Sequence, residues 1–219
     1  MDLITRTEDL AAACGKLSTA SFVTVDTEFM REQTFWPRLC LIQIAGGETE
    51  ILIDSLAPDL DLQPFFDLMV DESVLKVFHS ARQDIEIVHH LAGVVPQPIF
   101  DTQVAAMVCG FGEAVSYSML VKRLLGHNLD KSSRFTDWSR RPLTDRQLTY
   151  ALGDVTYLRD LYPKLRAQLD KSERASWLSE EMGVLTDPAT YEAHPEHAWR
   201  RLTMRIKTPK ALAILMELA

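Results

Sequence analysis

The stretch that decides the fold is FVTVDTEFMR (residues 22–31), in which an apolar run ends in two carboxylates, Asp26 and Glu28. Aromatic and β-branched residues favour a strand, and alternate side chains of a strand point to the same face. The two acids therefore share a face, with Cα atoms roughly 7 Å apart. If their oxygens approached to about 4 Å, the repulsion would be on the order of 4 kcal/mol. Solvent, a shared proton, a basic side chain or a divalent cation could relieve it.

Further strands and helices follow in an order typical of a mixed α/β sheet. Two aliphatic runs, RLCLIQIAG (38–46) and EILIDSL (50–56), meet at Gly46 and Gly47, which predicts an antiparallel hairpin. Strands that gather early and then alternate with helices predict parallel strands beside that hairpin. The further strands are expected within residues 74–78 and 98–102, and helical patterns lie at 61–71, 81–93, 102–111 and 116–126.

The strongest helical pattern begins near residue 144. Thr144 and Gln147 have the spacing of a capping box, and apolar residues then recur at helical spacing from 148 to 161. Pro163 is expected to kink or restart this helix, because proline lacks the N–H group that a helix interior uses.

Composition limits the class of protein. The 219 residues are 47% hydrophobic, and no uncharged apolar stretch approaches the roughly 18 residues of a membrane helix, so we expect a folded cytoplasmic protein. The net charge of −8 argues against binding nucleic acid through bulk positive charge. A nuclease that holds its substrate partly through metal ions would still need basic residues only around its groove. Cys14, Cys40 and Cys109 are scattered, and we expect reduced thiols in the core.

Three more candidate residues lie far along the sequence from the first pair. Ser80 and Gln83 have capping-box spacing, which puts Asp84 in the first turn of the helix that follows. Tyr150 and Asp154 are four residues apart on the long predicted helix, so they share a face. Each also has a structural interpretation: a carboxylate favoured by a helix N-terminus, and a tyrosine–aspartate pair on a half-buried face. Singly, none of them indicates a function.

Together the motifs form an ordered set: Asp-x-Glu at the end of a strand, an aspartate early in a later helix, and Tyr-x-x-x-Asp on the long helix. With the stretches DTQVAA (101–106) and DKSSRFTDWSRRPLT (130–144), the chain resembles the DEDD superfamily of 3′–5′ exonucleases in its tyrosine subclass, and specifically the bacterial ribonuclease D family. The proofreading branch of that superfamily places a histidine five residues before the last aspartate, where this sequence has Thr149.

The resemblance implies a ribonuclease H-like α/β fold, with a mixed five-stranded sheet surrounded by helices. It implies two divalent ions, Mg²⁺ or Mn²⁺, and no organic cofactor; carboxylate oxygens are ligands that these hard cations prefer. Asp26 would bridge the ions, Glu28 and Asp154 would hold the ion that binds the attacking water, and Asp84 would reach the other. Tyr150 would orient that water. The implied reaction trims RNA from its 3′ end, as in tRNA and structured-RNA processing, and releases nucleoside 5′-monophosphates.

Aromatic and basic residues cluster beside the first and last motifs, which is typical of single-strand binding by base stacking and phosphate contacts. The alternative is that the rings belong to the core and the basic groups are solvated. Preference for RNA over DNA rests on the resemblance alone, so a DNA exonuclease and an inactive RNA-binding module stay open as alternatives. The substrate-binding candidates are Phe29, Arg31, Trp36, His79, Lys131, Arg134 and Trp138.

The predicted domain organisation is an exonuclease domain at 1–183 and a second part at 184–219. Pro188 and Pro195 indicate a linker, and ALAILMELA (211–219) predicts an apolar helix. By the resemblance, this second part is a linker and the incomplete beginning of an HRDC domain, a small helical module that helps to bind RNA. RNA is the expected partner, no membrane is, and a monomer is favoured.

Overall fold

The computed structural model describes residues 3–32, 34–130, 132–133, 135–172, 174–192 and 208–218. Its strands are β1 (Leu3–Ile4), β2 (Phe22–Met30), β3 (Arg38–Gly46), β4 (Thr49–Ile53), β5 (Leu75–Phe78) and β6 (Ile99–Asp101). They form one mixed sheet in the order β1-β4-β3-β2-β5-β6. The pairs β2–β3 and β3–β4 are antiparallel and the others are parallel. The predicted α/β class is confirmed.

The sheet has six strands where five were expected. The additional strand is β1, which pairs in parallel with β4 through Leu3↔Leu52 and Ile4↔Ile53. Two residues are too few to show the alternation that identifies a strand in a sequence.

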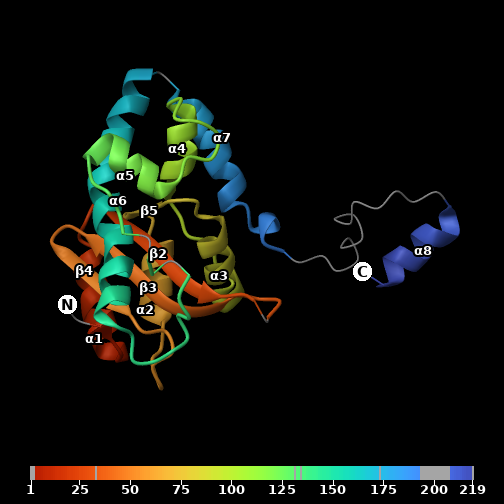
Figure 1. Ribbon diagram of the computed structural model, residues 1–219, viewed down its shortest axis with the longest axis horizontal. Helices are drawn as coiled ribbons and strands as arrows, with labels where there is room; N and C mark the ends of the chain where they lie inside the picture. The colour runs from red at the N-terminus through yellow and green to blue at the C-terminus, as the bar shows by residue number, and fades with distance from the viewer. Residues whose placement is uncertain are drawn as a thin grey trace.

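Helices cover both faces of the sheet. On one face α1, α2 and α3 share a core cluster with residues of β2, β3 and β4. On the other face α6 crosses β2, β3, β4 and β5, and α4 and α5 pack beside it (Figure 1). The helices are α1 (Thr7–Leu17), α2 (Gln63–Val70), α3 (Arg82–Ala92), α4 (Thr102–Val108), α5 (Tyr117–Leu125), α6 (Asp145–Ser172), α7 (Ala175–Thr186), α8 (Pro209–Leu218) and the short 3₁₀ helix η1 (Pro188–Thr190).

The hairpin of β3 and β4 forms where the glycine pair predicted it. Gly47 has φ of +54°, a conformation that glycine adopts without steric cost. Gly46 is needed for space, because a Cβ there would lie 2.8 Å from Val23 Cγ1. The turn therefore depends on both glycines for different reasons.

The long helix α6 begins with the predicted capping box. The Thr144 amide donates to Gln147 Oε1 at 3.0 Å, and the Gln147 amide donates to Thr144 Oγ1 at 3.3 Å. The expected restart at Pro163 does not occur, because α6 continues as one helix to Ser172. Buried Leu161 and Leu165, on both sides of the proline, pack in the same cluster, which favours a continuous helix there.

Residues after 183 contact the core. The boundary expected at 183 falls inside α7, and Tyr191 beyond it is 6% exposed within the cluster of α1, α2 and α3. Part of the predicted HRDC-like segment, residues 193–207, lies outside the described residues. Where the exonuclease domain ends stays a prediction. In the described part of the chain, no helix has the length and apolar character needed to span a membrane.

Candidate active site

The end of β2 that carries Asp26 and Glu28 extends beyond the last residue of its neighbour β5 that pairs with it. β2 pairs with β5 only from Phe22↔Leu75 to Thr24↔Val77, whereas its pairing with β3 continues to Met30. β5 ends at Phe78, and the chain then turns into α3. One edge of β2 is thus open for residues from α3, while α6 packs on its face.

Three carboxylates from two distant elements meet at this place. Asp26 and Glu28 of β2 and Asp154 of α6 each offer an oxygen, and these oxygens all lie within 4.8 Å of one another. The three side chains line a cavity of about 450 Å³, together with Asp84 and Tyr150. Burial raises the pKa of Asp26 well above its usual range, and the charge of Asp154 raises it further. Hard oxygen donors that lie this close and repel one another fit a divalent cation.

Asp84 lines the same cavity from α3, in the first helical turn as expected. It is 6% exposed, and the Thr27 hydroxyl donates to its carboxylate at 2.5 Å. Burial raises its pKa most, the charge of Asp26 raises it as well, and the bond from Thr27 lowers it. Asp84 is not a member of the tight group of three oxygens.

The capping box expected before Asp84 does not form. Ala81 is the N-cap residue of α3, and its own side chain makes no capping hydrogen bond. The amides of Ser80 and Ala81 donate instead to the carboxylate of Asp101, at 3.0 and 2.8 Å. A carboxylate at the end of β6 thus replaces the local cap that the spacing of Ser80 and Gln83 predicted.

Tyr150 and Asp154 share a face of α6, and both line the cavity. The Tyr150 ring also lies beside the ring of Trp138, with 6.1 Å between the centroids. The structure therefore brings all five of the predicted catalytic residues to one cavity, from β2, α3 and α6.

Tyr117 lines the cavity as well, and the sequence did not indicate it. Its hydroxyl donates to the carbonyl of Gly153 at 3.0 Å, on the turn of α6 before Asp154. Burial raises its pKa, and the charges of Asp154 and Asp26 add to this effect. The pattern at 116–126 indicated only a helix, because no motif links Tyr117 to the acids.

Two of the predicted substrate-binding residues, Phe29 and His79, line the cavity. His79 Nδ1 lies 3.0 Å from the Thr102 hydroxyl, and its Nε2 is buried without a hydrogen-bond partner among the described residues. Burial lowers the pKa of His79 to about 4, so the ring is neutral at physiological pH.

Among the described residues, the other substrate-binding candidates do not line the cavity. Arg31 pairs with Glu86 of α3 through contacts of 2.7 and 3.2 Å. Trp36 stacks on His90 with ring centroids 4.3 Å apart. Trp138 is 2% exposed, so its ring is not accessible for stacking with bases. The remaining two candidates, Lys131 and Arg134, lie outside the described residues.

Comparison with known proteins identifies the family. Residues 1–170 match a family model described as 3′-5′ exonuclease. The chain belongs to the 3′–5′ exonuclease family. Among relatives of this chain, a ribonuclease D from Nitrobacter hamburgensis is 58% identical over all of this chain, which corresponds to 57% of that relative. The chain spans about half of the length of the ribonuclease D relatives that it matches.

Solved structures share the fold of this chain. Escherichia coli RNase D, an exoribonuclease involved in structured RNA processing, is 35% identical with a TM-score of 0.86, over 91% of this chain and 53% of that one. Brucella melitensis NrnC with bound Mg²⁺ is 26% identical with a TM-score of 0.72, over 88% of this chain and 93% of that one. The predicted ribonuclease H-like exonuclease fold is thus confirmed, and NrnC, which shares this fold, holds bound Mg²⁺.

Proposed function

We propose that this chain is a 3′–5′ exoribonuclease that hydrolyses the terminal phosphodiester bond of RNA and releases nucleoside 5′-monophosphates. The observation that carries the proposal is the cluster of Asp26, Glu28 and Asp154, whose oxygens lie within 4.8 Å of one another. Similarity to ribonuclease D supports RNA as the substrate. Similarity to the Escherichia coli enzyme supports structured RNAs, such as tRNA precursors, as the class.

Two divalent ions, Mg²⁺ or Mn²⁺, belong to the proposal. Asp26, Glu28 and Asp154 would hold one ion, and Asp84, which lines the same cavity, would complete the set for the second. When bound, such ions stabilise the charge that develops on the attacking and leaving oxygens at phosphorus. The raised pKa of Asp26 supports this assignment, because a cation would offset the repulsion that burial and Asp154 impose.

The protein's own side chains would position the reactants. The Tyr150 hydroxyl would orient the attacking water by hydrogen bonding, since it lies one helical turn before Asp154. Tyr117 would fix the intervening turn of α6 through its bond to Gly153. Phe29 and His79, which line the cavity, would contact the terminal nucleotide.

The test is digestion of single-stranded RNA labelled at its 5′ end, in Mg²⁺ or Mn²⁺. We expect a ladder that shortens stepwise from the 3′ end, no digestion in EDTA, and no ladder from Asp26→Asn. A missing ladder, or one that persists in Asp26→Asn, would contradict the proposal. Faster digestion of a matched DNA oligomer would favour the DNA exonuclease, and RNA binding without cleavage or Mn²⁺ uptake would favour an inactive binding module.

The cytoplasmic location, the monomeric state and an HRDC-like beginning in residues 184–219 are part of the same proposal. They rest on the similarity to ribonuclease D and on the composition of the chain. Size-exclusion chromatography with light scattering measures the oligomeric state directly.

A further inference from the structure

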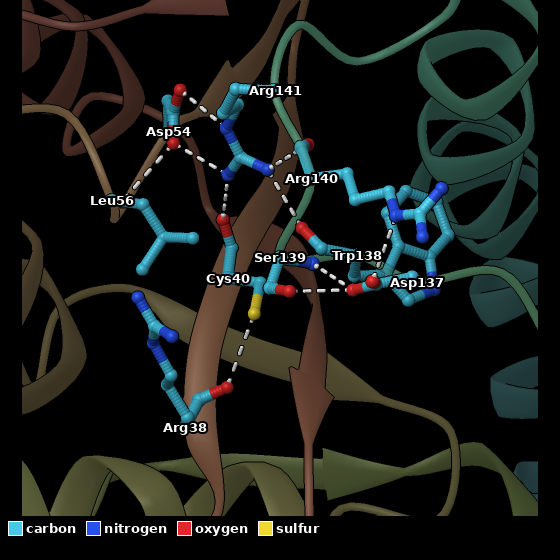
Figure 2. Close-up of polar contacts among 9 residues, drawn as sticks. All are labelled: Arg38, Cys40, Asp54, Leu56, Asp137, Trp138, Ser139, Arg140 and Arg141. Carbon is cyan, nitrogen blue, oxygen red and sulfur yellow. Dashed lines mark hydrogen bonds and ion pairs between the residues drawn. The ribbon is translucent and has the colours of Figure 1, made fainter.

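Arg141 lies between α5 and α6, and every N–H donor of its side chain makes a hydrogen bond. A guanidinium has five N–H donors, and in Arg141 each of them is used. Nε and Nη2 donate to the carboxylate of Asp54 at 2.8 and 2.6 Å. Nη1 donates to the carbonyls of Trp138 and Arg140 at 2.7 and 2.9 Å, and Nη2 also donates to the carbonyl of Cys40 at 2.7 Å (Figure 2).

Asp54 anchors this arrangement to the sheet. It follows β4 directly, its side chain is 9% exposed, and it also accepts a bond from the Leu56 amide at 3.0 Å. A half-buried ion pair contributes little net stability, because desolvation offsets much of the attraction, but its bidentate geometry is specific. The arginine therefore holds the loop in one position relative to β3 and β4.

The loop residue that this arrangement holds most directly is Trp138. Arg141 binds the Trp138 carbonyl, while the Trp138 ring belongs to a core cluster with Cys40, Leu41 and Leu52. The indole Nε1 has no hydrogen-bond partner among the described residues, so packing and the held backbone orient the ring. That ring lies 6.1 Å from the ring of Tyr150 at an angle of 37°.

We propose that Arg141, held by Asp54, is a positioning residue for Tyr150. It fixes the backbone of Trp138, whose ring supports the Tyr150 ring and so keeps the phenol hydroxyl in place at the carboxylate cavity. This inference rests on the proposed function, in which Tyr150 orients the attacking water. It also gives Trp138 a role other than the base stacking expected from the sequence.

A double-mutant cycle tests this role. Arg141→Ala and Arg141→Lys are each measured alone and combined with Tyr150→Phe, on the same RNA. Because a small displacement of a catalytic group has a large effect, we expect kcat to fall about tenfold in both single variants, with KM within about twofold of wild type. Arg141→Lys should not restore kcat, because lysine lacks the planar fork of five donors. In the Tyr150→Phe background, Arg141→Ala should change kcat by less than about twofold.

Arg159 offers a matched control. Its side chain is also 25% exposed, and it also joins the α6 side of the molecule to the hairpin, through Glu50 at 2.7 Å and the carbonyl of Gly47 at 3.1 Å. Both of these partners belong to the hairpin, and neither is Trp138 or Tyr150. Arg159→Ala should therefore leave kcat at the wild-type value.

Two results would overturn the proposal: an unchanged kcat in Arg141→Ala, or an equal fall of kcat with and without the Tyr150 hydroxyl. If Arg141→Ala does not fold, Trp138→Leu takes its place in the cycle with the same expected coupling. A readout without metal or RNA is the ¹⁹F spectrum of 5-fluorotryptophan-labelled protein, with the Trp138 resonance assigned by Trp138→Phe. That resonance should shift in Arg141→Lys and in Tyr150→Phe but not in Arg159→Ala, and no shift would contradict the proposal even if wild type proved inactive.

Discussion

Asp26 is the residue at which stability and the proposed activity oppose each other. Burial and the neighbouring Asp154 raise its pKa, which means that the ionised form destabilises the folded chain when no cation is bound. The same ionised form is the one that a divalent cation requires. Metal binding should therefore contribute to the stability of this fold as well as to catalysis.

We expect Asp26→Asn to abolish digestion of RNA and to raise the melting temperature in EDTA. Removing about 1 kcal/mol of electrostatic repulsion should raise the melting temperature by roughly 3 °C in a domain of this size. Differential scanning fluorimetry at pH 8 measures the shift. Asp160→Asn, an exposed aspartate of α6, should leave both properties unchanged. A lower melting temperature of Asp26→Asn in EDTA would show that its charge is already compensated.

The pH dependence follows from the same shifts. Because the pKa values of Asp26 and Asp84 are raised on folding, the folded chain binds protons at pH values where the unfolded chain does not. The stability that these protons contribute is lost as the pH rises through the raised pKa values. The lowered pKa of His79 has the opposite effect, but only below about pH 6.5, where the unfolded imidazole becomes protonated.

In EDTA, the two carboxylates should therefore lower the stability as the pH rises through their raised pKa values, and Mn²⁺ should restore it. Urea denaturation at several pH values, with and without Mn²⁺, measures both effects. The double variant Asp26→Asn/Asp84→Asn is the control, with a flatter profile and no response to Mn²⁺. A wild-type profile as flat as that of the variant would contradict the assignment.

At the scale of elements, the β3–β4 hairpin and α6 carry the site. The hairpin supplies the partner strand for the acidic end of β2, and α6 brings Tyr150 and Asp154 onto that strand. The sequence shows a local signal for each element: the glycine pair marks the turn of the hairpin, and the capping box marks the start of α6. Those signals are local because turns and helix ends are stabilised by neighbours in the sequence.

Gly46→Ala should destabilise the hairpin. Its Cβ would lie 2.8 Å from Val23 Cγ1 and 3.1 Å from Leu17 Cδ2, so the packing must shift at a cost of roughly 1–3 kcal/mol. Guanidinium denaturation measures the change. The matched variant is Gly15→Ala at an exposed position of α1, where the added Cβ has nothing within 4 Å, and helix propensity predicts a gain of roughly 0.5–1 kcal/mol. Equal effects of the two substitutions would contradict the packing argument.

At the scale of the whole molecule, α7 and Tyr191 pack in the core clusters on the two faces of the sheet. Leu178 of α7 is 7% exposed in the cluster of α4, α5 and α6, and Tyr191 reaches the cluster on the other face. The Tyr191 hydroxyl also donates to the carbonyl of Leu185 at 2.8 Å. α7 and η1 thus connect the two halves of the core.

Tyr191→Ala should lower the free energy of unfolding by about 3 kcal/mol, because it removes a large buried ring. A chain ending at residue 183 should be less stable by at least as much than one ending at 192, which keeps the contacts of Tyr191. Urea denaturation of the three chains compares them. If the chain ending at 183 were as stable as the full chain, the domain would end at the boundary that the sequence predicted.

Much of this molecule could be predicted from local patterns. Alternation and helical spacing located most of the strands and helices, and the same periods put Asp26 beside Glu28 and Tyr150 beside Asp154. The resemblance to the exonuclease superfamily then joined these pairs and Asp84 into one proposed site. What the patterns missed were features made by contacts between distant segments: β1 in the sheet, the Asp101 carboxylate at the start of α3, and Tyr117 in the cavity.

The sequence by itself determined which residues pair within each element, because a strand or a helix orients its own side chains by its period. Only the tertiary structure decided that Asp154 approaches Asp26 and Glu28, since that distance depends on how α6 packs on the sheet. It also decided the place of Trp138, which the sequence offered equally as a stacking platform or a core residue. The bonds that hold Arg141 to Asp54 and Cys40 bury that ring, and they join residues about a hundred positions apart.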